Sequence, residues 1–558
     1  MNDDYDVAVV GGGLAAVSAA KWAVESGANV ALVTRGWLGS IGVRGSGASS
    51  CGTTEHGAPS FNRLTDCSFD PDEFQQKIIN AGLGLISREK VRLFVEEFVK
   101  LQPQAKEVAS LYKQPGPYTL GTPLIHHYLA QIKDKITTIP HTTVARILVH
   151  DGVCGGVCCI HEKSGETFSL RAKAVILAAG GSAGLFSTHV HPECVSGDGY
   201  VLGLLAGAKL VNLEFMQIFS MTTAPTRNLI HFWKPEFLHS VKNAHGEAFI
   251  ENYLPQGISL EQCIQENVLH APFSVRDEAS RYLGIGITKE IQAGRGSPAG
   301  GVYIDLRNCP SFIASRQYWF LRYRGIDAAR IPLEVSMGFQ CCNGGLVVDD
   351  DMATETAGLY AAGENAGGLH GADRLGGNML SGCVISGKLA GQAAAAYSRK
   401  ATMLSSIEEP KIVSLLGNQP HITPDQKGTY QQMIQEIREM AQDQLLLIKS
   451  REGLEKTRQQ LDDLTAKAAA VAGSPKQLPI ELENMLLLSR ALWLAASSRD
   501  ESRGGFYRED FPGPNLTTKP KTHIVSLQQS GDIELAKVIA DPEWDPDYQN
   551  KLTNERWG

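Results

Sequence analysis

The stretch VAVVGGGLAAVSAA, residues 7–20, decides the fold. Its four leading apolar residues predict a buried parallel strand, and the residues from Leu14 onward predict a helix. Gly11 and Gly13 allow a tight turn between the two, and Ala16 is small enough for the helix to pack on the strand. A helix that starts on a glycine-rich turn directs N–H groups and its positive dipole end at a phosphate. The stretch therefore predicts a Rossmann-like dinucleotide-binding unit rather than a simple glycine turn.

The next strand, ANVALVTR (residues 28–35), leaves the identity of the dinucleotide open. Such a strand ends in the residue that contacts the adenosine ribose, roughly 20 residues past the glycines. Here it ends in Thr34 and Arg35, with no Asp or Glu. A hydroxyl could contact a ribose and an arginine could contact a 2′-phosphate, so FAD and NADP both remain possible at this point.

Composition and charge narrow the class of protein. The 558 residues are 43% hydrophobic and 20% charged, which is typical of a globular chain with two or three domains. The net charge of −8 argues against a nucleic-acid or anionic-membrane partner. No apolar run approaches the ~18 residues of a membrane span, and the acidic start MNDDYD is unlike a signal peptide. We therefore expect a cytoplasmic protein.

The cysteines indicate reduced thiols rather than a disulfide framework or a metal site. There are 11 of them, scattered along a long chain. The two adjacent pairs, in VCCI and QCCN, lack C-x-x-C spacing, so we expect neither a metal ion nor an iron–sulfur cluster.

The order of periodic patterns along the chain predicts an α/β architecture. Strand and helix patterns alternate up to about residue 210, mixed α+β patterns follow, and helical periodicity dominates from about 424 to 500. Within the mixed part, residues 275–291 predict a short helix. The expected parts are a Rossmann-like nucleotide-binding domain (1–215 and 336–405), an inserted α+β capping domain (216–335), a C-terminal helical domain (420–512) and an irregular tail (513–558).

Several separated blocks identify the family. They are VILAAGG (175–181), SGDGYVLGLLAGAKLVNLEFMQ (196–217), VRDEASRYLGIGITKEIQAGRG (275–296), GLYAAGENAGGLHGADRLGGN (358–378) and AASSRDESRGGFYREDFP (495–512). Together with the opening stretch, in this order, they resemble the flavoprotein subunits of succinate dehydrogenase and fumarate reductase and the single-chain L-aspartate oxidase. The resemblance spans about residues 5–512 and implies that the dinucleotide is FAD.

The resemblance also implies where FAD is held. The residues expected at the pyrophosphate and adenosine are Gly11, Gly13, Leu14, Ala15, Ala16, Thr34, Arg35 and Val144. Those expected along the ribitol and flavin are Ser40, Arg44, Gly45, Ser46, Gly47, Ala179, Gly180, Asp198, Glu364, Arg374, Asn378, Met379 and Leu380. For Asp198 and Glu364, which are expected at the flavin and the ribitol, helix capping is the alternative.

One feature of the family is missing. Members in membrane complexes attach FAD to a histidine soon after the second strand, and the segment RGWLGSIGVRGSG (residues 35–47) has none. The nearest histidine, His56, lies about nine residues too far along the chain. We therefore expect noncovalent FAD.

The resemblance assigns the chemistry to two arginines. Arg276 matches the proton donor or acceptor, although a salt bridge at a helix start is the alternative, and the neighbouring Asp277 could relay the proton. Arg374 matches the arginine that grips a substrate carboxylate with its fork. Gln217 and His370 occupy substrate or flavin positions.

The chain departs from the family where the far end of the substrate would lie. Phe219 and Gln340 replace two histidines, Phe506 replaces a histidine that many members carry, and Asp373 replaces an asparagine. The T-E-x-x-R-G-E-G-G segment is not recognisable in residues 228–249. We therefore expect a substrate other than a C4 dicarboxylate, unless a lysine such as Lys234 or Lys242 restores the missing charge.

These residues predict an FAD oxidoreductase that acts on the bond next to a carboxylate. It would oxidise an amino acid with dioxygen as acceptor, or interconvert a saturated acid and an enoate with an unidentified redox partner. The first alternative is a flavoprotein subunit that passes electrons to an iron–sulfur partner. The second is a flavin-binding protein that has lost catalysis, against which the two retained arginines argue.

Overall fold

The computed structural model describes residues 4–36, 70–111, 121–192, 194–227, 233, 240–307, 309–314, 316–323, 325–376, 378–404, 424–472, 478–515, 519–528 and 530–539. Seven residues singled out in the sequence lie outside these ranges, namely Ser40, Arg44, Gly45, Ser46, Gly47, His56 and Lys234.

A seven-stranded sheet forms the centre of the first domain. Its order is β3-β2-β1-β6-β5-β4, and β13 also pairs with β6. Strands β3, β2, β1, β6 and β13 run parallel, whereas β5 and β4 extend the sheet antiparallel. Strands β1, β2 and β13 are almost wholly buried, as their continuous apolar sequences predict. The strands are β1 (Tyr5–Val10), β2 (Val30–Val33), β3 (Ile136–Ile139), β4 (Thr142–His150), β5 (Val153–His161), β6 (Thr167–Leu177) and β13 (Leu359–Ala361).

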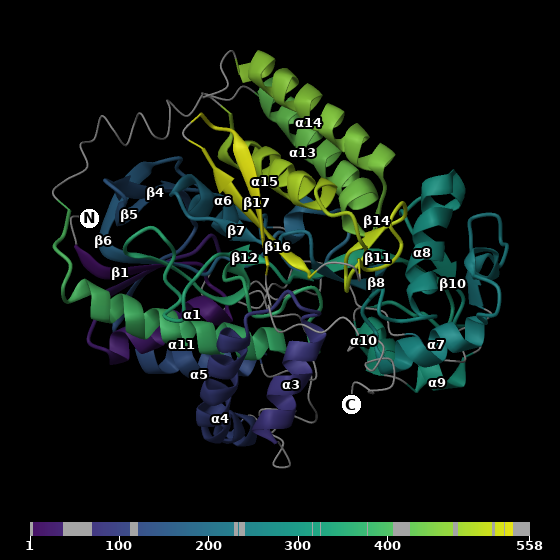
Figure 1. The fold of residues 1–558 in the computed structure, drawn as a ribbon, viewed down its shortest axis with the longest axis horizontal. Helices are drawn as coiled ribbons and strands as arrows, with labels where there is room; N and C mark the ends of the chain where they lie inside the picture. Colours follow the sequence, from purple (N-terminus) through teal and green to yellow (C-terminus); the bar gives the residue numbers. More distant parts are fainter. Residues whose placement is uncertain are drawn as a thin grey trace.

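Two helices from opposite ends of this domain pack closely on each other, α1 (Leu14–Glu25) and α11 (Asn378–Ser398) (Figure 1). Glycines make the close approach possible: a Cβ on Gly391 would lie 2.4 Å from the Ala19 carbonyl oxygen. The Ser18 hydroxyl donates to the Val384 carbonyl at 2.8 Å. The FAD-type turn before α1 and the segment before α11 are therefore held as one unit.

Three further helices cover the outer side of this pair, α3 (Pro71–Ala81), α4 (Arg88–Leu111) and α5 (Gly121–Ile132) (Figure 1). Their apolar side chains form a second core with residues of α1 and α11.

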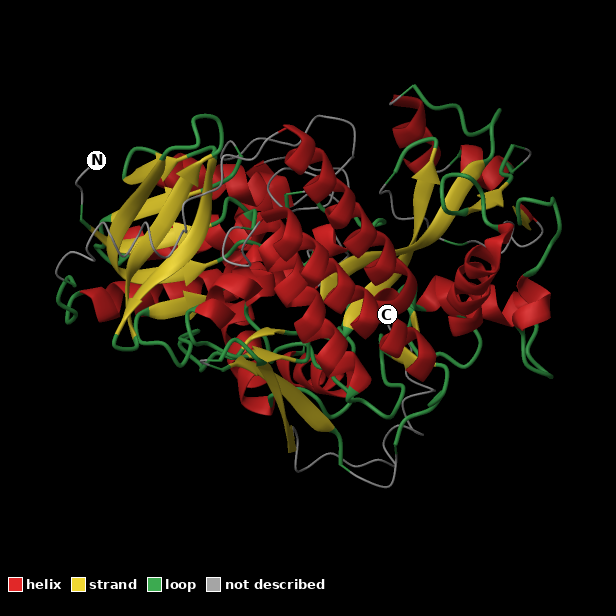
Figure 2. Cartoon of the chain, turned by 90° about the horizontal axis from the view of Figure 1, so that it is seen from above, coloured by secondary structure: helices red, strands yellow, loops and turns green. Residues whose placement is uncertain are grey.

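The inserted part forms a separate lobe around a four-stranded sheet of order β8-β11-β10-β9 (Figures 1 and 2). Strands β8 and β11 are long and lead back to the first domain, so they connect the two parts. The elements are β8 (Met216–Ala224), β9 (Val241–Lys242), α7 (Leu260–Leu269), α8 (Arg281–Glu290), β10 (Val302–Ile304), α9 (Pro310–Ile313), α10 (Arg316–Tyr323) and β11 (Leu333–Cys342). The helix expected over 275–291 begins only at Arg281, because residues 274–280 form turns.

The C-terminal part consists mainly of three helices, α13 (Pro424–Ala441), α14 (Arg451–Ala472) and α15 (Ile480–Ser497). A π-helical turn, Gln442–Leu446, follows α13. The short strand β14 (Ile448–Lys449) then pairs with β15 (Tyr507–Arg508), so the segment after α15 returns to the helices.

The expectation of an irregular tail over 513–558 is wrong for part of it. Strands β16 (Lys521–Leu527) and β17 (Ile533–Ile539) form a hairpin, which joins β7 (Leu210–Val211) and β12 (Gly345–Leu346) in a third sheet. The hairpin docks because Val525 is buried and because the His523 ring lies 3.0 Å from the buried Glu214 carboxylate. This ion pair joins positions about 300 residues apart, so local patterns do not reveal it.

Among the described residues, no helix is both long and apolar enough to cross a bilayer. In the same part of the chain, no cluster of three or more His, Cys, Asp or Glu side chains has the arrangement of a metal site.

Candidate functional site

The glycine turn after β1 has the geometry of a phosphate-binding turn. Gly11 has φ +131°, and a Cβ there would lie 2.1 Å from the Ala178 carbonyl oxygen, so no other residue fits. Helix α1 begins directly after it, with neither a side-chain cap nor an acidic residue in its first turn. The N–H groups of this turn are therefore available to an anion.

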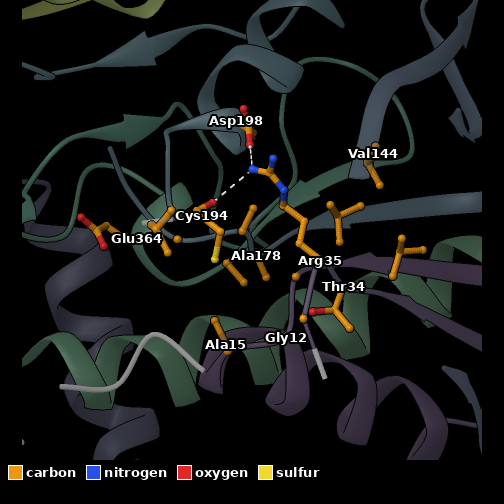
Figure 3. Close-up of a pocket in the computed structure, with 18 of the residues that line it drawn as sticks. Gly12, Ala15, Thr34, Arg35, Val144, Ala178, Cys194, Asp198 and Glu364 are labelled. Atoms are coloured by element: carbon orange, nitrogen blue, oxygen red, sulfur yellow. Dashed lines mark hydrogen bonds and ion pairs between the residues drawn. The ribbon is translucent and has the colours of Figure 1, made fainter. Parts of the chain in front are cut away.

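A cavity opens above this turn, at the carboxyl ends of the parallel strands (Figure 3). In α/β sheets this edge is where ligands bind. Figure 3 shows Thr34 and Val144 across the cavity from Glu364. The predicted cofactor residues that line it are Gly11, Gly13, Leu14, Ala15, Thr34, Arg35, Val144, Ala179, Gly180, Asp198, Glu364, Met379 and Leu380.

Of the predicted cofactor residues that the structure describes, three do not line this cavity. Ala16 is fully buried beneath the turn, where its small side chain lets α1 approach the sheet. Asn378 and Arg374 are also buried, and lie in or beside the first turn of α11.

Two residues that line the cavity, Arg35 and Asp198, form an ion pair that the sequence did not reveal. The Arg35 guanidinium contacts Asp198 at 3.0 Å and Glu162 at 3.1 Å. Burial lowers the pKa of Arg35, but these carboxylates outweigh burial and raise it. Arg35 and Asp198 thus lie at the same end, so the expected roles at the adenosine ribose and at the flavin do not fit one extended cofactor.

Glu364 lies on the other side of the cavity and is held rigidly. Its Oε1 accepts from the Cys342 backbone N–H at 2.7 Å, and a Cβ on Gly181 would collide with it at 2.0 Å. Burial raises the pKa of Glu364.

Asn365 was missed by sequence reasoning although it follows Glu364 directly. Its amide accepts from the Ala179 N–H at 2.6 Å and donates to the Gly180 carbonyl at 2.9 Å. It therefore fixes the conformation of the loop after β6. The signal that could have found it was its position in the block AAGEN.

Arg374 is the centre of the candidate substrate site. It is 3% exposed, and its guanidinium donates to Gln217 and, at 3.5 Å, to Gln340. A third bond goes to the Leu375 carbonyl. Three residues predicted to form one site thus meet, and among the described residues all three hydrogen-bond acceptors of this guanidinium are uncharged. Its Nε has no partner there. Within the described part of the chain, the Arg374 guanidinium is thus a buried cation that no anionic side chain contacts.

The strand that carries Gln217 also presents Phe219 on the same face, because side chains alternate along β8. Phe219 is partly buried and packs with Val190 and Met221. The region beyond Gln217 is therefore apolar at the position of the missing histidine.

His370 lies close enough to Arg374 for that charge to act on it. Burial first, and then the positive charge of Arg374, lower the pKa of His370 to about 3. The ring is therefore neutral near pH 7 and cannot act as a strong acid there. Its Nδ1 lacks a partner among the described residues.

The loop that carries Arg276 is tied to the loop that carries Arg374. The Ser274 hydroxyl donates to Asp373 at 2.7 Å, and the Arg374 backbone N–H donates to the same carboxylate at 2.8 Å. Arg276 and Asp277 precede α8, as part of the turns at 274–280. The structure thus brings the predicted catalytic loop and carboxylate-binding loop together.

A second residue missed in the sequence is His270, whose Nδ1 lies 2.8 Å from Asp277. A third is His191, which lines the cavity and contacts the Gln340 carbonyl at 2.5 Å. His191 thereby links the cofactor cavity to the substrate side.

Buried amides test whether these residues fit an isoalloxazine. Asn343 and Asn378 are at most 2% exposed, and within the described residues neither atom of either amide has a hydrogen-bond partner. A buried amide without partners is costly, about 1–3 kcal/mol per group. A heterocycle with carbonyl and N–H groups would satisfy such amides, but neither of them lines the cavity above the Gly11 turn, so the fit to FAD rests on the phosphate-binding geometry of that turn.

Comparisons with known proteins agree with this fit. Residues 6–380 match the family described as FAD binding domain, and residues 434–547 match the fumarate reductase flavoprotein C-terminal family. An uncharacterized FAD-dependent oxidoreductase of Methanocaldococcus jannaschii is 30% identical over 387 residues, 68% of each chain. A fumarate reductase (CoM/CoB) subunit of Methanothermobacter marburgensis is 26% identical, over 91% of this chain and 95% of its own. L-aspartate oxidase of Streptomyces coelicolor is 25% identical, over 97% of this chain and 94% of its own.

The fold is also found in solved structures. Sdh1 of Mycobacterium smegmatis in complex with UQ1 superposes with a TM-score of 0.79, at 23% identity, over 99% of this chain and 97% of that one. The α/β fold with a C-terminal helical part, expected from the sequence, is confirmed.

Proposed function

Because this chain belongs to the family of FAD-binding flavoproteins that includes fumarate reductase, the succinate dehydrogenase flavoprotein and L-aspartate oxidase, we propose that it oxidises or reduces the bond next to a substrate carboxylate. The chain is an FAD-dependent oxidoreductase of that family. FAD supplies the two-electron acceptor or donor at its N5 atom when it is bound. The observation that carries the proposal is the buried Arg374 guanidinium, whose acceptors among the described residues are all uncharged.

The cofactor is held from both sides of the cavity in this proposal. The turn at Gly11 and Gly13 receives the pyrophosphate, and Thr34 contacts the adenosine ribose. Arg35, held by Asp198, lies at the same end. Glu364 accepts from the ribitol, and Asn378 bonds to the flavin. FAD is bound noncovalently, because residues 35–47 contain no histidine to which it could be attached.

Arg374 holds and orients the substrate carboxylate. Gln217 fixes the guanidinium through one hydrogen bond and binds the Arg374 carbonyl at 3.0 Å through another, so the fork has little freedom. An ion that is already positioned loses less side-chain entropy when the substrate binds. The neutral His370 ring can add a hydrogen bond without competing for the anion.

Arg276 donates or accepts the substrate proton. It is partly exposed and sits on the loop that Ser274 ties to the Arg374 loop. An arginine is a poor acid in water, so the role requires that its proton be replaced during the reaction. Asp277 is the neighbouring carboxylate that can take part.

The far end of the substrate is apolar or neutral. Phe219 cannot donate to a second carboxylate, and Gln340 already binds Arg374 weakly. Burying a carboxylate there without charged donors would cost several kcal/mol. A monocarboxylate with an apolar, aromatic or amide tail is therefore the proposed substrate class.

Anaerobic reduction of the bound flavin tests the proposal. A panel of amino acids and saturated acids is mixed with the holoprotein, and bleaching of the oxidised flavin's visible absorbance is followed by stopped flow. Reduction by at least one carboxylate supports the proposal, and loss of that reduction with its methyl ester supports binding through Arg374. If no member of the panel reduces the flavin, and no enoate reoxidises the chemically reduced protein, the proposal is wrong.

The same experiment can also identify the electron acceptor, when air is admitted to the reduced protein. Air admitted after anaerobic reduction should restore the oxidised flavin within the turnover time if dioxygen is the acceptor. Slow reoxidation favours the alternative, a flavoprotein subunit that passes electrons to an iron–sulfur partner. The nearly full-length similarity to a protein whose name describes one subunit of a fumarate reductase is the observation that keeps this alternative.

A further inference from the structure

Next to Arg276 lies a histidine–aspartate pair, His270 and Asp277, and we propose that this pair passes protons between Arg276 and solvent. The proposal rests on the proposed function, because it assumes that Arg276 exchanges a proton with the substrate.

His270 and Asp277 are hydrogen-bonded to each other, and the pair is adjacent to Arg276 in the chain. His270 ends helix α7, and its Nδ1 lies 2.8 Å from Oδ2 of Asp277. Asp277 follows Arg276 directly in the chain. The side chains of His270 and Asp277 are 9% and 10% exposed, so the pair is largely buried but reaches the surface. Protons can therefore enter or leave at its edge.

Neighbouring groups hold the pair in position. The Ser280 hydroxyl donates to the same Asp277 oxygen at 3.0 Å. The Glu266 carboxylate on α7 accepts the backbone N–H groups of Ala279 at 2.7 Å and Ser280 at 2.5 Å. Helix α7 and the turn after Asp277 are thus joined at two points, and the His270–Asp277 distance is set by the fold.

The charges around His270 suit a group that exchanges protons. Burial lowers the pKa of His270, but Asp277, through its charge and its hydrogen bond, and the more distant Asp373 outweigh burial and raise it. Arg276 acts in the opposite direction, which shows that it lies within electrostatic reach. Glu266, one turn earlier on α7, is committed to backbone N–H groups. A histidine whose pKa is raised above its ordinary value keeps its proton to a higher pH than a free imidazole does.

The proton balance closes in both directions. In oxidation the substrate gives a hydride, with its electron pair, to the flavin and a proton to Arg276. For this, the Arg276 cation first passes one of its own protons to Asp277, Asp277 passes one to neutral His270, and His270 releases one to water, so that Arg276 has a free site for the substrate proton. Arg276 is a cation before and after. In reduction every proton moves the opposite way, starting from protonated His270.

This route fixes the sign of a pH dependence. Oxidation of the substrate needs neutral His270, so the rate of flavin reduction should rise as the pH increases through the pKa of His270. Reduction needs protonated His270, so its rate should fall through the same pKa.

His270→Asn is the decisive variant, because the asparagine amide can replace Nδ1 as a donor to Asp277 but cannot titrate. The holoprotein should keep its FAD and its melting temperature, while the rate of flavin reduction should fall about 10²-fold, the lower end for general acid–base contributions. The change of this rate with pH that is due to the titration of His270 should disappear. Ser280→Ala, which removes only the second donor to Asp277, should retain that change with pH.

His150→Asn provides the matched control. His150 faces Asp151 at 3.5 Å, but its side chain is 56% exposed and lies on β4, in a different part of the fold. This variant should leave the rate and the pH profile unchanged.

A measurement without turnover tests the pair directly. Exchange of the imidazole C2 hydrogen in heavy water, read by mass spectrometry of peptides, gives the pKa of each histidine. His270 should titrate above its ordinary value of about 6.5 in the holoprotein, and Asp277→Asn should lower its pKa.

The outcomes separate this inference from the proposed function. If the wild type oxidises a carboxylate and His270→Asn keeps both its rate and its pH profile, the relay is wrong and the proposed function stands. An unchanged titration of His270 in Asp277→Asn also overturns the relay. If no carboxylate reduces the flavin and no enoate reoxidises the reduced protein, the proposed function fails and the relay fails with it.

Discussion

Gln217 binds Arg374 at both ends, because its Nε2 donates to the Arg374 carbonyl at 3.0 Å and its Oε1 accepts from the guanidinium. The residue that positions the arginine therefore comes from β8, a strand that continues into the inserted lobe, whereas the arginine comes from the segment before α11. If Arg374 binds the substrate as proposed, we expect substrate binding to depend on the junction between the two parts of the chain.

Arg374→Lys should weaken substrate binding more than it slows turnover. A lysine cannot form the forked contact, and hydrogen bonds to charged groups contribute about 1.5–3 kcal/mol, so KM should rise at least ~10-fold. Gln217→Ala should also raise KM, because the Arg374 guanidinium would no longer be held in position by the Gln217 side chain. Steady-state kinetics checks this, with the exposed Arg458→Lys as the control. Normal KM values in both variants would place the carboxylate elsewhere.

Arg276→Lys should retain FAD but lose at least ~10²-fold in turnover. An ammonium cannot reproduce the placement of a guanidinium that both exchanges a proton and binds an oxygen. Single-turnover flavin reduction measures this loss separately from product release. Turnover close to that of the wild type would remove Arg276 from the chemistry.

The purified protein should be yellow and should release its flavin when the polypeptide is precipitated with acid. This follows from the absence of a histidine in residues 35–47. The absorbance of the supernatant and of the washed pellet decides the matter. Flavin that stays with the pellet would indicate a covalent bond.

L-aspartate, succinate and fumarate should be poor substrates, with kcat/KM below the ~10⁴ M⁻¹s⁻¹ of ordinary enzymes. The physical reason is that Phe219 offers no donor to a second carboxylate. Phe219→His combined with Gln340→His should raise kcat/KM for these dicarboxylates. A high wild-type value would mean that another group, such as Lys242, supplies the missing charge.

Glu214→Gln should destabilise the protein at pH 7 by about 1.5–3 kcal/mol, the range for a hydrogen bond to a charged group, because it removes one of the two carboxylates that contact buried Arg499 and leaves only Glu501 at 3.0 Å. Glu214 is fully buried, and Arg499 approaches it at 2.7 Å. Burial raises the pKa of Glu214, but Arg499 and His523 outweigh burial and lower it to about 2.

The sign of the pH effect follows from that lowered pKa. The contribution of ionised Glu214 to the free energy of unfolding is fully present above the ordinary glutamate pKa near 4.5. It is lost as the pH falls toward the lowered pKa of about 2. Wild-type melting temperatures should therefore fall more steeply over this range than those of Glu214→Gln. Glu483→Gln, which removes the partly exposed partner of Arg146, should change stability by less than about 1 kcal/mol. Equal acid sensitivity of wild type and Glu214→Gln would contradict the assignment.

The sequence by itself determined the features that depend on neighbouring residues. The turn at Gly11 follows from a strand, a glycine that needs positive φ and a helix start within a few residues. The continuous apolar runs of β1 and β2 specified a parallel sheet, because strands buried on both faces leave no polar alternation. The family blocks added FAD and the two arginines.

Only the tertiary structure decided which distant side chains meet. Arg35 contacts Asp198 across 163 positions, and Glu214 contacts His523 across about 300, so no local pattern encodes either pair. His270 was missed because its partner lies beyond a helix end, where neither a 3.6-residue nor a two-residue period applies. Local backbone preferences set helices, strands and turns, whereas packing of the whole chain brings charges together. The elements could therefore be derived from the sequence, and the electrostatics of the site could not.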